Sequence, residues 1–509
     1  MNYLWHYPQY FNSNSLLALA LSALFCVCAL FTFRKNELAF KIVLFLIGIS
    51  VAYFACSLDI FLHRWDEQYH ALVAKNMMSD LFNPVLYKNS LLATNTEHWS
   101  SSHIWLHKQP LFLWQMSLSM KIFGLNEIAL RLPNIIAHGF LVVFVYDMGK
   151  ELLSDFVGLL SAITFCYLRF PLSYSAGMEA TDHNDYMFLF YVTASFWALF
   201  KYNNSKKIQY LVLVGVFVGS AVLVKWLAGF LVIGVWISYC LLYERKIIMK
   251  PLMAFLIAVV IALPWQIYCY IKYKTIFLSE MSFNSRHISE SLEGHVGDWY
   301  YHLNGIKELY ANNDLIFLII GVAVALFILN KKVIPFHKFS ILLSIALVYV
   351  FFSFVKTKMP AFCIIVIPLV ILIIISSLVE VMNKIKQTRF RRLIYLLLVP
   401  QLIIFFFSPS YFIKRHTLNY RPNEHTMSKY IYERAFIQEL GKQMSGKKLV
   451  FINANGLAVK LMFYLDCDAT DKVLDKETIS NLKLENYQLV AFKRGLPEYI
   501  ISDKTIIKI

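Results

Sequence analysis

The sequence predicts an all-α polytopic membrane domain with extracytoplasmic loop helices, followed by a small C-terminal α/β domain. Hydrophobic residues make up 58% of the 509 residues and charged residues only 16%, which leaves too few charges to cover a soluble globule of this size. Apolar runs of about 20 residues, the length that a bilayer core of roughly 30 Å requires, recur up to residue 410. We therefore expect a transmembrane domain over residues 1–410 and a small periplasmic domain over residues 411–509.

The apolar runs predict about twelve transmembrane helices. The first run, residues 16–33, has no basic residue before it and no small-residue cleavage site, so we expect a membrane span rather than a cleaved signal. The runs begin near Leu16, Phe40, Pro133, Asp155, Asn184, Ile208, Leu227, Pro251, Leu315, Phe339, Pro360 and Leu393.

Lysine and arginine are concentrated in every second connection, as at residues 34–35, 206–207 and 384–392, which predicts that these connections are cytoplasmic. Both termini and two long loops, residues 64–132 and 272–314, then lie on the outer side. These short basic loops account for the formal net charge of +16, so no nucleic acid partner is expected. We expect a multi-pass protein of the bacterial inner membrane whose functional groups face the periplasm.

The C-terminal tail has the pattern of alternating strands and helices. Residues 448–452 are typical of a strand, residues 456–465 of a helix, and residues 487–492 of a second strand. Most of the eight cysteines lie in apolar runs, so neither a disulfide framework nor a metal-type spacing is indicated. The sequence also lacks a Gly-rich phosphate loop, so no site for a nucleotide-linked donor is visible.

Two adjacent acids, Asp66 and Glu67, stand directly after the second apolar run. A carboxylate at the membrane surface could accept the proton of an attacking hydroxyl group. The alternative is a structural role at a helix N-terminus, where acids favour the positive end of the helix dipole. Further along the same loop, Lys108 could hold a phosphate as a point charge, or could simply extend from an interfacial helix to water.

Other outer connections carry further candidates. His295, between two glycines and before three aromatic residues, could contact a phosphate or a metal, although such aromatics also form interfacial belts. Lys356 and Lys358 stand in a short outer loop, although lysine and arginine are usually concentrated in cytoplasmic loops. Binding of a phosphate would explain this exception. Asp182 belongs to a polar group that could bind a sugar, a metal or only water. All these residues are predicted on one side of the membrane.

At these positions the sequence resembles the membrane glycosyltransferases of the C-type fold. The resemblance is to the family that joins protein O-mannosyltransferases and lipid A aminoarabinose transferases (glycosyltransferase family 39/83-like). It rests on an ordered series of blocks across about residues 60 to 370: Asp66-Glu67, Lys108 to Leu111, Phe123 to Pro133, Gly219 to Lys225, Gly294 to Tyr301, and Ser353 to Pro360 with Pro368.

The resemblance implies an inverting transferase that uses a polyprenyl-phosphate sugar and no nucleotide. Asp66 would be the catalytic base. The residues expected to bind the donor phosphate or the substrate are Glu67, Lys108, Arg131, Asp182, His295, Lys356 and Lys358. The positive groups among them would stabilise the charge that builds on the departing phosphate.

Two positions depart from the family pattern. Gln109 replaces the usual first proline after Lys108, and His107 stands where the aminoarabinose transferases commonly carry an acid. The departure leaves open whether a divalent metal is needed. A metal held by His107 and His295 is one expectation.

The acceptor is expected to be lipid A or lipopolysaccharide, with protein Ser/Thr as the alternative. A lipid-linked glycan transporter or flippase is the rival from another class. Transporters usually place ionisable residues or broken helices near the bilayer midplane, whereas here the charges stand mostly at helix ends and in outer loops. This distribution favours an enzyme.

Overall fold

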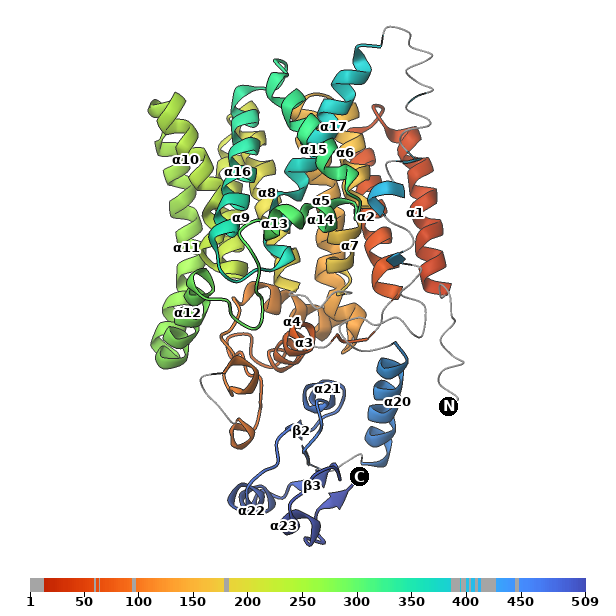
Figure 1. Ribbon diagram of the computed structural model, residues 1–509, viewed down its shortest axis with the longest axis vertical. Coiled ribbons are helices and arrows are strands. Elements are labelled where there is room, and N and C mark those ends of the chain that lie inside the picture. The colour runs from red at the N-terminus through yellow and green to blue at the C-terminus, as the bar shows by residue number, and fades with distance from the viewer. Residues whose placement is uncertain are drawn as a thin grey trace.

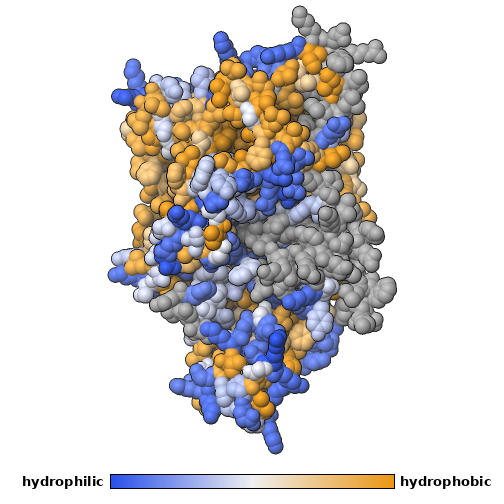
Figure 2. Space-filling view, in the orientation of Figure 1, coloured by the Kyte–Doolittle hydropathy of each residue, from blue (hydrophilic) through white to orange (hydrophobic). Residues whose placement is uncertain are grey.

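The computed structural model describes residues 13–58, 61–63, 65–93, 98–177, 183–385, 394, 400–401, 404–407, 411–412, 427–444 and 448–509. A tall bundle of helices forms one part of the molecule, and a small unit with a sheet lies below it, as Figure 1 shows. The apolar colouring of the bundle surface contrasts with the mixed surface of the lower unit (Figure 2). This architecture confirms the predicted polytopic helical membrane fold.

Seven helical segments of the described residues are long and apolar enough to cross a membrane, or up to nine if each of two bent pairs is one span. The seven are α1 (Ser13–Thr32), α2 (Glu37–Leu58), α5 (Glu127–Leu152), α9 (Ile208–Lys225) with η4 (Trp226–Phe230) and α10 (Leu231–Tyr243), η5 (Arg245–Ile247) with α11 (Met249–Lys272), α16 (Pro335–Phe354), and η6 (Pro360–Val366) with α17 (Ile367–Asn383). The bent pairs are α6 (Asp155–Cys166) with α7 (Arg169–Ser175), at 57°, and α13 (Tyr301–Asn304) and α14 (Ile306–Tyr310) with α15 (Leu315–Leu329), at 98°.

The sequence predicts about twelve spans, which is more than the seven to nine in the described residues, for three reasons. The segment 208–243 holds two of the expected runs, and the run expected near Leu393 lies outside the described residues. The third is α8 (His183–Ser205), which is not among the candidate spans. Of its 23 side chains, 17 are buried, so α8 makes little use of a lipid-facing surface and tolerates polar residues.

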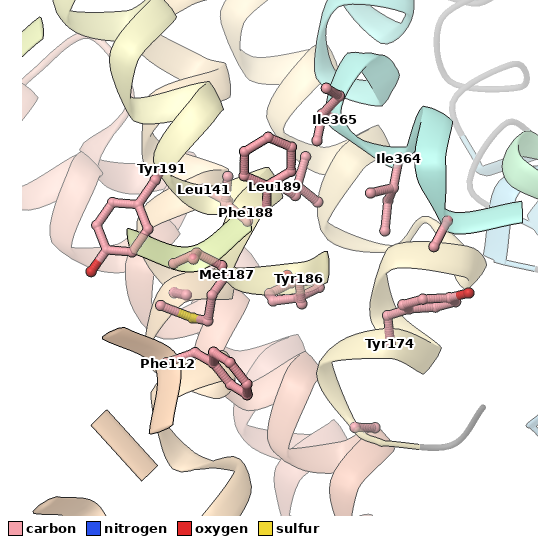
Figure 3. Packing of buried hydrophobic residues seen from close by; sticks show 14 of the residues in the cluster. Phe112, Leu141, Tyr174, Tyr186, Met187, Phe188, Leu189, Tyr191, Ile364 and Ile365 are labelled. Carbon is pink, nitrogen blue, oxygen red and sulfur yellow. The ribbon is translucent and has the colours of Figure 1, made fainter. Parts of the chain in front are cut away.

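Helix α8 lies at the centre of the packing in Figure 3. Its residues Tyr186 to Leu189 and Tyr191 belong to one continuous hydrophobic core with Leu141 of α5 and Ile364 of η6. Phe112 of α4 (Leu111–Phe123) joins the same core from the first long outer loop. The core therefore connects the membrane helices to the loop that carries the candidate acids.

The two long outer loops fold into short helices. The first contains α3 (Asp66–Asn76), the single turns η2 (Ser90–Leu92) and η3 (Trp99–Ser101), and α4. The second contains α12 (Lys274–Ser289), α13 and α14. Helices in the two long loops, as expected from the sequence, are therefore present; the side of the membrane on which they lie stays a prediction.

The C-terminal unit contains a four-stranded parallel sheet in the order β2-β1-β3-β4. Its elements are α20 (Met427–Gln443), β1 (Leu449–Ile452), α21 (Ala458–Tyr464), β2 (Asp468–Ala469), α22 (Lys476–Leu484), β3 (Gln488–Ala491), α23 (Glu498–Ile501) and β4 (Ile507–Lys508). The expected strands near 448–452 and 487–492 and the helix between them are confirmed. The domain boundary at residue 411 stays a prediction.

Polar contacts hold this unit against the outer face of the bundle. The ammonium group of Lys75 on α3 donates to the carbonyls of Met462 (2.6 Å), Phe463 (3.0 Å) and Leu465 (3.0 Å) at the end of α21. Exposed carbonyls at a helix C-terminus favour a cation. Lys75 therefore fixes α21 beside α3.

We predict that Gly48→Ala destabilises the protein, because α2 and α5 meet at glycines. A Cβ at Gly48 would lie 2.8 Å from the Cα of Gly139, and overpacking of this kind typically costs about 1–3 kcal/mol. Thermal unfolding of the purified protein measures the effect. Gly234→Ala on α10 is the matched control, since nothing lies within 4 Å of its Cβ position. Equal melting temperatures for the two variants would contradict the prediction.

Candidate functional site

Asp66 is the first residue of α3 and follows a sharp turn after the second span. The residue before it, Trp65, has a φ of 72°, a left-handed conformation that is uncommon for a bulky residue. Asp66 is half-buried, whereas the next residue, Glu67, is fully buried. Successive helical residues point in different directions, so the two adjacent acids have different surroundings.

Glu67 is bonded to Arg131 of α5 in a fully buried ion pair. Its Oε1 accepts from Arg131 Nε at 2.7 Å, and its Oε2 accepts from Arg131 Nη2 at 3.0 Å and from the backbone amide of His63 at 2.7 Å. Both side chains are 0% exposed. Gly177, with a φ of 62°, makes room for the pair, because a Cβ there would overlap Glu67 Oε1 and lie 2.8 Å from Arg131 Nε.

This pair bears on two expectations from the sequence. Glu67 and Arg131 were expected to bind the donor phosphate or the substrate; in the structure their buried side chains bind each other, and a contact with the donor stays a prediction. Burial alone would raise the pKa of Glu67, but Arg131 and then His183 outweigh burial and hold the pKa well below its usual range. Glu67 is therefore an ionised structural group.

His183, the first residue of α8, extends the network. Its Nε2 lies 3.0 Å from Glu67 Oε1, and its Nδ1 lies 2.8 Å from the side-chain nitrogen of Asn134. Since an amide nitrogen donates, Nδ1 accepts and Nε2 donates to Glu67. On the same helix, Asp185 pairs with Lys225 at the end of α9. Asp182, a predicted substrate-binding residue, lies outside the described residues.

Trp99 joins the two long outer loops. Its indole nitrogen donates to Glu293 Oε1 at 2.7 Å, and its ring stacks on His107 with 4.7 Å between centroids. Tyr69, one turn after Asp66 on α3, contacts the Trp99 ring at 4.9 Å between centroids. His107 Nδ1 in turn lies 3.1 Å from Glu280 Oε2 on α12. The start of α3, the Lys108 segment and α12 therefore meet at one place.

Positive groups gather beside this junction. The charge of Lys108 acts on both Glu280 and His287 of α12, and the charges of Lys225 and His295 also act on His287. Burial raises the pKa of Glu280 to about 7 despite Lys108. Burial lowers the pKa of His287 to about 4 despite the opposing charge of Glu293.

The loop after α16 binds the second outer loop through its backbone. The amides of Lys356, Thr357 and Lys358 donate to the carbonyls of Ile288, His287 and His295, each at 3.1 Å. The Thr357 hydroxyl lies 3.0 Å from His287 Nδ1. This pairing brings Lys356 to the same place, and we call Lys108, Lys225, His295 and Lys356 the basic cluster.

The two lysines of this loop have different environments. Lys356 is exposed. Lys358 is buried at 3% exposure, and its ammonium donates to the carbonyls of Phe352 and Ser353 at the end of α16, each at 2.8 Å. Lys358 thus caps a helix, and the expectation that it binds phosphate stays a prediction.

The residues described by the structure contain no group of three or more His, Cys, Asp or Glu side chains that could hold a metal ion. His107, one of the two expected metal ligands, faces Glu280. His295, the other, is half-exposed in the basic cluster. A metal held by these two histidines stays a prediction.

Sequence reasoning missed three residues of the site: Lys225, Glu280 and His287. Lys225 could have been noticed as a lysine at the outer end of an apolar run. Glu280 and His287 are seven residues apart on α12, two helical turns, which places them on one face. Glu280 lies opposite His107 and His287 opposite Thr357, so both partners are distant in the sequence and spacing alone carried no signal of their role.

We predict that Glu67→Gln destabilises the protein by about 3–5 kcal/mol, because Arg131 is left buried without a counter-charge. The pKa of Glu67 is lower in the folded state than its unfolded value of about 4.3. Its stabilising effect is therefore complete above that pH and is lost as the pH falls below it. Between about pH 7 and pH 3, the melting temperature should fall more steeply for the wild type than for the variant.

The matched control is Glu380→Gln, which removes the surface pair of Glu380 with Lys332. Surface pairs contribute about 0–1 kcal/mol, so this variant should melt close to the wild type. A Glu67→Gln protein as stable as the control would show that the buried pair does not stabilise the fold.

Known proteins show similarity to the part of the chain that contains several of these site residues. Residues 107–268 match the family model described as dolichyl-phosphate-mannose-protein mannosyltransferase. This segment includes Lys108, Arg131, His183 and Lys225. An uncharacterised protein of Aquifex aeolicus is 28% identical over 223 residues, which span 42% of this chain and 40% of that protein. The chain thus matches less than half of the length of this relative.

Solved structures share the fold. ArnT from Cupriavidus metallidurans superposes with a TM-score of 0.62 in the form bound to undecaprenyl phosphate and 0.59 in the apo form, at 14% identity over 87% of this chain and 88% of ArnT. The archaeal oligosaccharyltransferase AglB of Archaeoglobus fulgidus, in complex with an inhibitory peptide and a dolichol-phosphate, gives 0.55 at 10% identity, over 85% of this chain and 64% of AglB. The resemblance found in the sequence is therefore confirmed, and the chain has the C-type fold of the membrane glycosyltransferases related to ArnT and the protein mannosyltransferases.

Proposed function

We propose that this chain is an inverting glycosyltransferase that moves a sugar from a polyprenyl-phosphate donor to an acceptor hydroxyl on the periplasmic side of the membrane. The observation that carries the proposal is the basic cluster, which four separate outer segments build beside the helix that begins with Asp66. The family match over residues 107–268 and the fold shared with a structure that binds undecaprenyl phosphate support a lipid-phosphate donor.

In this proposal Asp66 is the catalytic base. It removes the proton from the acceptor hydroxyl as the hydroxyl oxygen attacks the anomeric carbon of the sugar. The bond from that carbon to the phosphate oxygen breaks on the opposite face, so the configuration inverts and polyprenyl phosphate leaves. Ionised Glu67 takes no proton in this step, because its carboxylate is bonded to Arg131.

The basic cluster stabilises the departing phosphate. Lys108 and Lys356 supply positive charge from two different loops, and His295 lies beside them in the second outer loop. Fixed charges placed where negative charge develops lower the barrier without reorganisation during the reaction. Glu280, on which the charge of Lys108 acts, limits the net charge of the site when it is ionised.

We propose lipid A or lipopolysaccharide as the acceptor, in the inner membrane of a bacterium. The sequence resemblance to lipid A aminoarabinose transferases supports this choice. The description of the matching family, which names protein mannosyltransferases, supports protein Ser/Thr as the second candidate. Mass spectrometry of lipid A and of envelope glycoproteins, from cells that lack the gene and cells that carry it, distinguishes the two.

We predict that Asp66→Asn abolishes transfer, lowering the rate at least about a hundredfold, because the amide accepts no proton from the hydroxyl. Mass spectrometry of the glycosylated acceptor in complemented cells measures the effect. Asp80→Asn, an exposed acid in the same outer loop, is the control and should transfer normally. Full activity of Asp66→Asn in normally inserted protein would refute the catalytic role of Asp66.

We also predict that Lys108→Met weakens binding of polyprenyl phosphate about tenfold or more, since a charge-assisted hydrogen bond contributes about 1.5–3 kcal/mol. Titration of the purified protein in lipid nanodiscs measures the dissociation constant. Lys274→Met, at the exposed start of α12, removes the same charge outside the cluster. Similar losses for the two variants would point to a general surface charge effect and not to a phosphate site.

A further inference from the structure

A second compartment adjoins the basic cluster. It is a cavity of about 630 Å³, within the range of roughly 300–1,000 Å³ that is typical of small-ligand sites. It is lined by Arg169, Gly297, Asp298, Tyr300, Tyr301, Asn304, Gly305, Lys307, Glu308, Asn312, Pro360 and Tyr411. The cavity thus combines α7, the second outer loop with α13 and α14, and the start of η6.

The chemistry of this lining is unusual for a membrane protein. Three tyrosines, two asparagines and four charged residues line the cavity, and the lining includes no alanine, valine, leucine, isoleucine or methionine. In Figure 1, α13 and α14 lie at the height of the membrane-spanning helices.

The lining charges balance. Arg169 and Lys307 are positive and Asp298 and Glu308 are negative. Both positive groups already have partners: Arg169 donates to the backbone carbonyl of Glu308 at 2.6 Å and lies 4.8 Å from the centre of the Tyr411 ring, and Lys307 pairs with Asp314 at 2.8 Å. The cavity therefore differs from the basic cluster, where Lys108 and Lys356 bring positive charge from two loops.

Gly297 marks the border between the two compartments. A Cβ there would lie 2.6 Å from the Tyr301 ring on the cavity side and 3.0 Å from Lys358 Cγ on the side of the cluster. The neighbouring His295 carbonyl accepts from the Lys358 amide at 3.1 Å. The cavity therefore adjoins the loops that carry His295 and Lys356 of the basic cluster.

From this arrangement we infer that the cavity binds one or two neutral sugar rings of a carbohydrate acceptor, an inference that rests on the proposed function. A sugar ring has hydroxyl groups that both donate and accept, and the two asparagine amides of the lining also do both. Its C–H faces carry slight positive charge and pack on the negative faces of tyrosine rings. An uncharged ligand suits a cavity whose own charges cancel.

Two exposed residues allow the inference to be tested without disturbing the fold. Tyr300 is 42% exposed and Asn304 is also exposed, so replacing them by alanine leaves the core unchanged. The probe is an octyl β-maltoside that carries a diazirine on the sugar, added to the full chain in lipid nanodiscs. After irradiation, mass spectrometry locates the cross-linked peptides.

We expect cross-links within residues 297–312 that free maltose suppresses. The double variant Tyr300→Ala with Asn304→Ala should lower them roughly tenfold, the equivalent of losing one or two hydrogen bonds. Lys356→Met should leave them unchanged while weakening the binding of polyprenyl phosphate. Melting temperatures of both variants establish that they are folded.

Cross-links confined to lipid-facing helices, or cross-links in the cavity that the double variant does not reduce, would overturn the inference. Labelling of the cavity by a Ser/Thr peptide that carries a diazirine, with none by the maltoside, would also overturn it and favour a protein acceptor. If maltoside labelling behaves as expected but Asp66→Asn transfers normally, the proposed function fails while the sugar site stands.

Discussion

The buried ion pair of Glu67 and Arg131 is the interaction on which the geometry of the site depends. Two charges without solvent contact are stable only when their hydrogen-bonding capacity is met inside the protein. Arg131, the amide of His63 and His183 meet that of Glu67. These partners come from a membrane helix, the turn before α3 and the start of α8. The pair therefore fixes three segments, and with them the position of Asp66.

The C-terminal unit supports the same place from outside. Arg434 of α20 lies 3.2 Å from Glu127, which precedes Arg131 by about one turn on α5. Tyr464 of α21 also bonds Glu127, while Lys75 ties α21 to the far end of α3. Helix α5 thus contacts the C-terminal unit through Glu127 in its first turn and Glu67 through Arg131 in its second turn. Movement of the C-terminal unit would act directly on α3.

Sequence reasoning found the membrane helices because soluble proteins rarely contain uncharged apolar runs of that length, and it found β1 from its composition. It could not separate Asp66 from Glu67, since adjacent acids differ only in the direction that the helix gives them. Lys356 and Lys358 posed the same problem, because one is exposed and the other caps α16. A helix was expected near residue 184, where α8 begins, but α8 lies inside the bundle, where hydropathy is no guide to lipid contact.

In the proposed mechanism, the two compartments divide the recognition of a charged and an uncharged partner. Attraction of a phosphate by Lys108 and Lys356 would act over several ångströms and weaken with salt, so the cluster would capture its ligand before close contact. A cavity whose charges cancel acts only through hydrogen bonds and ring contacts, which demand close fit. The charged ligand would therefore be held first and the neutral one oriented against it. That order suits a reaction in which the attacking hydroxyl must be aligned with a bond already fixed by its phosphate.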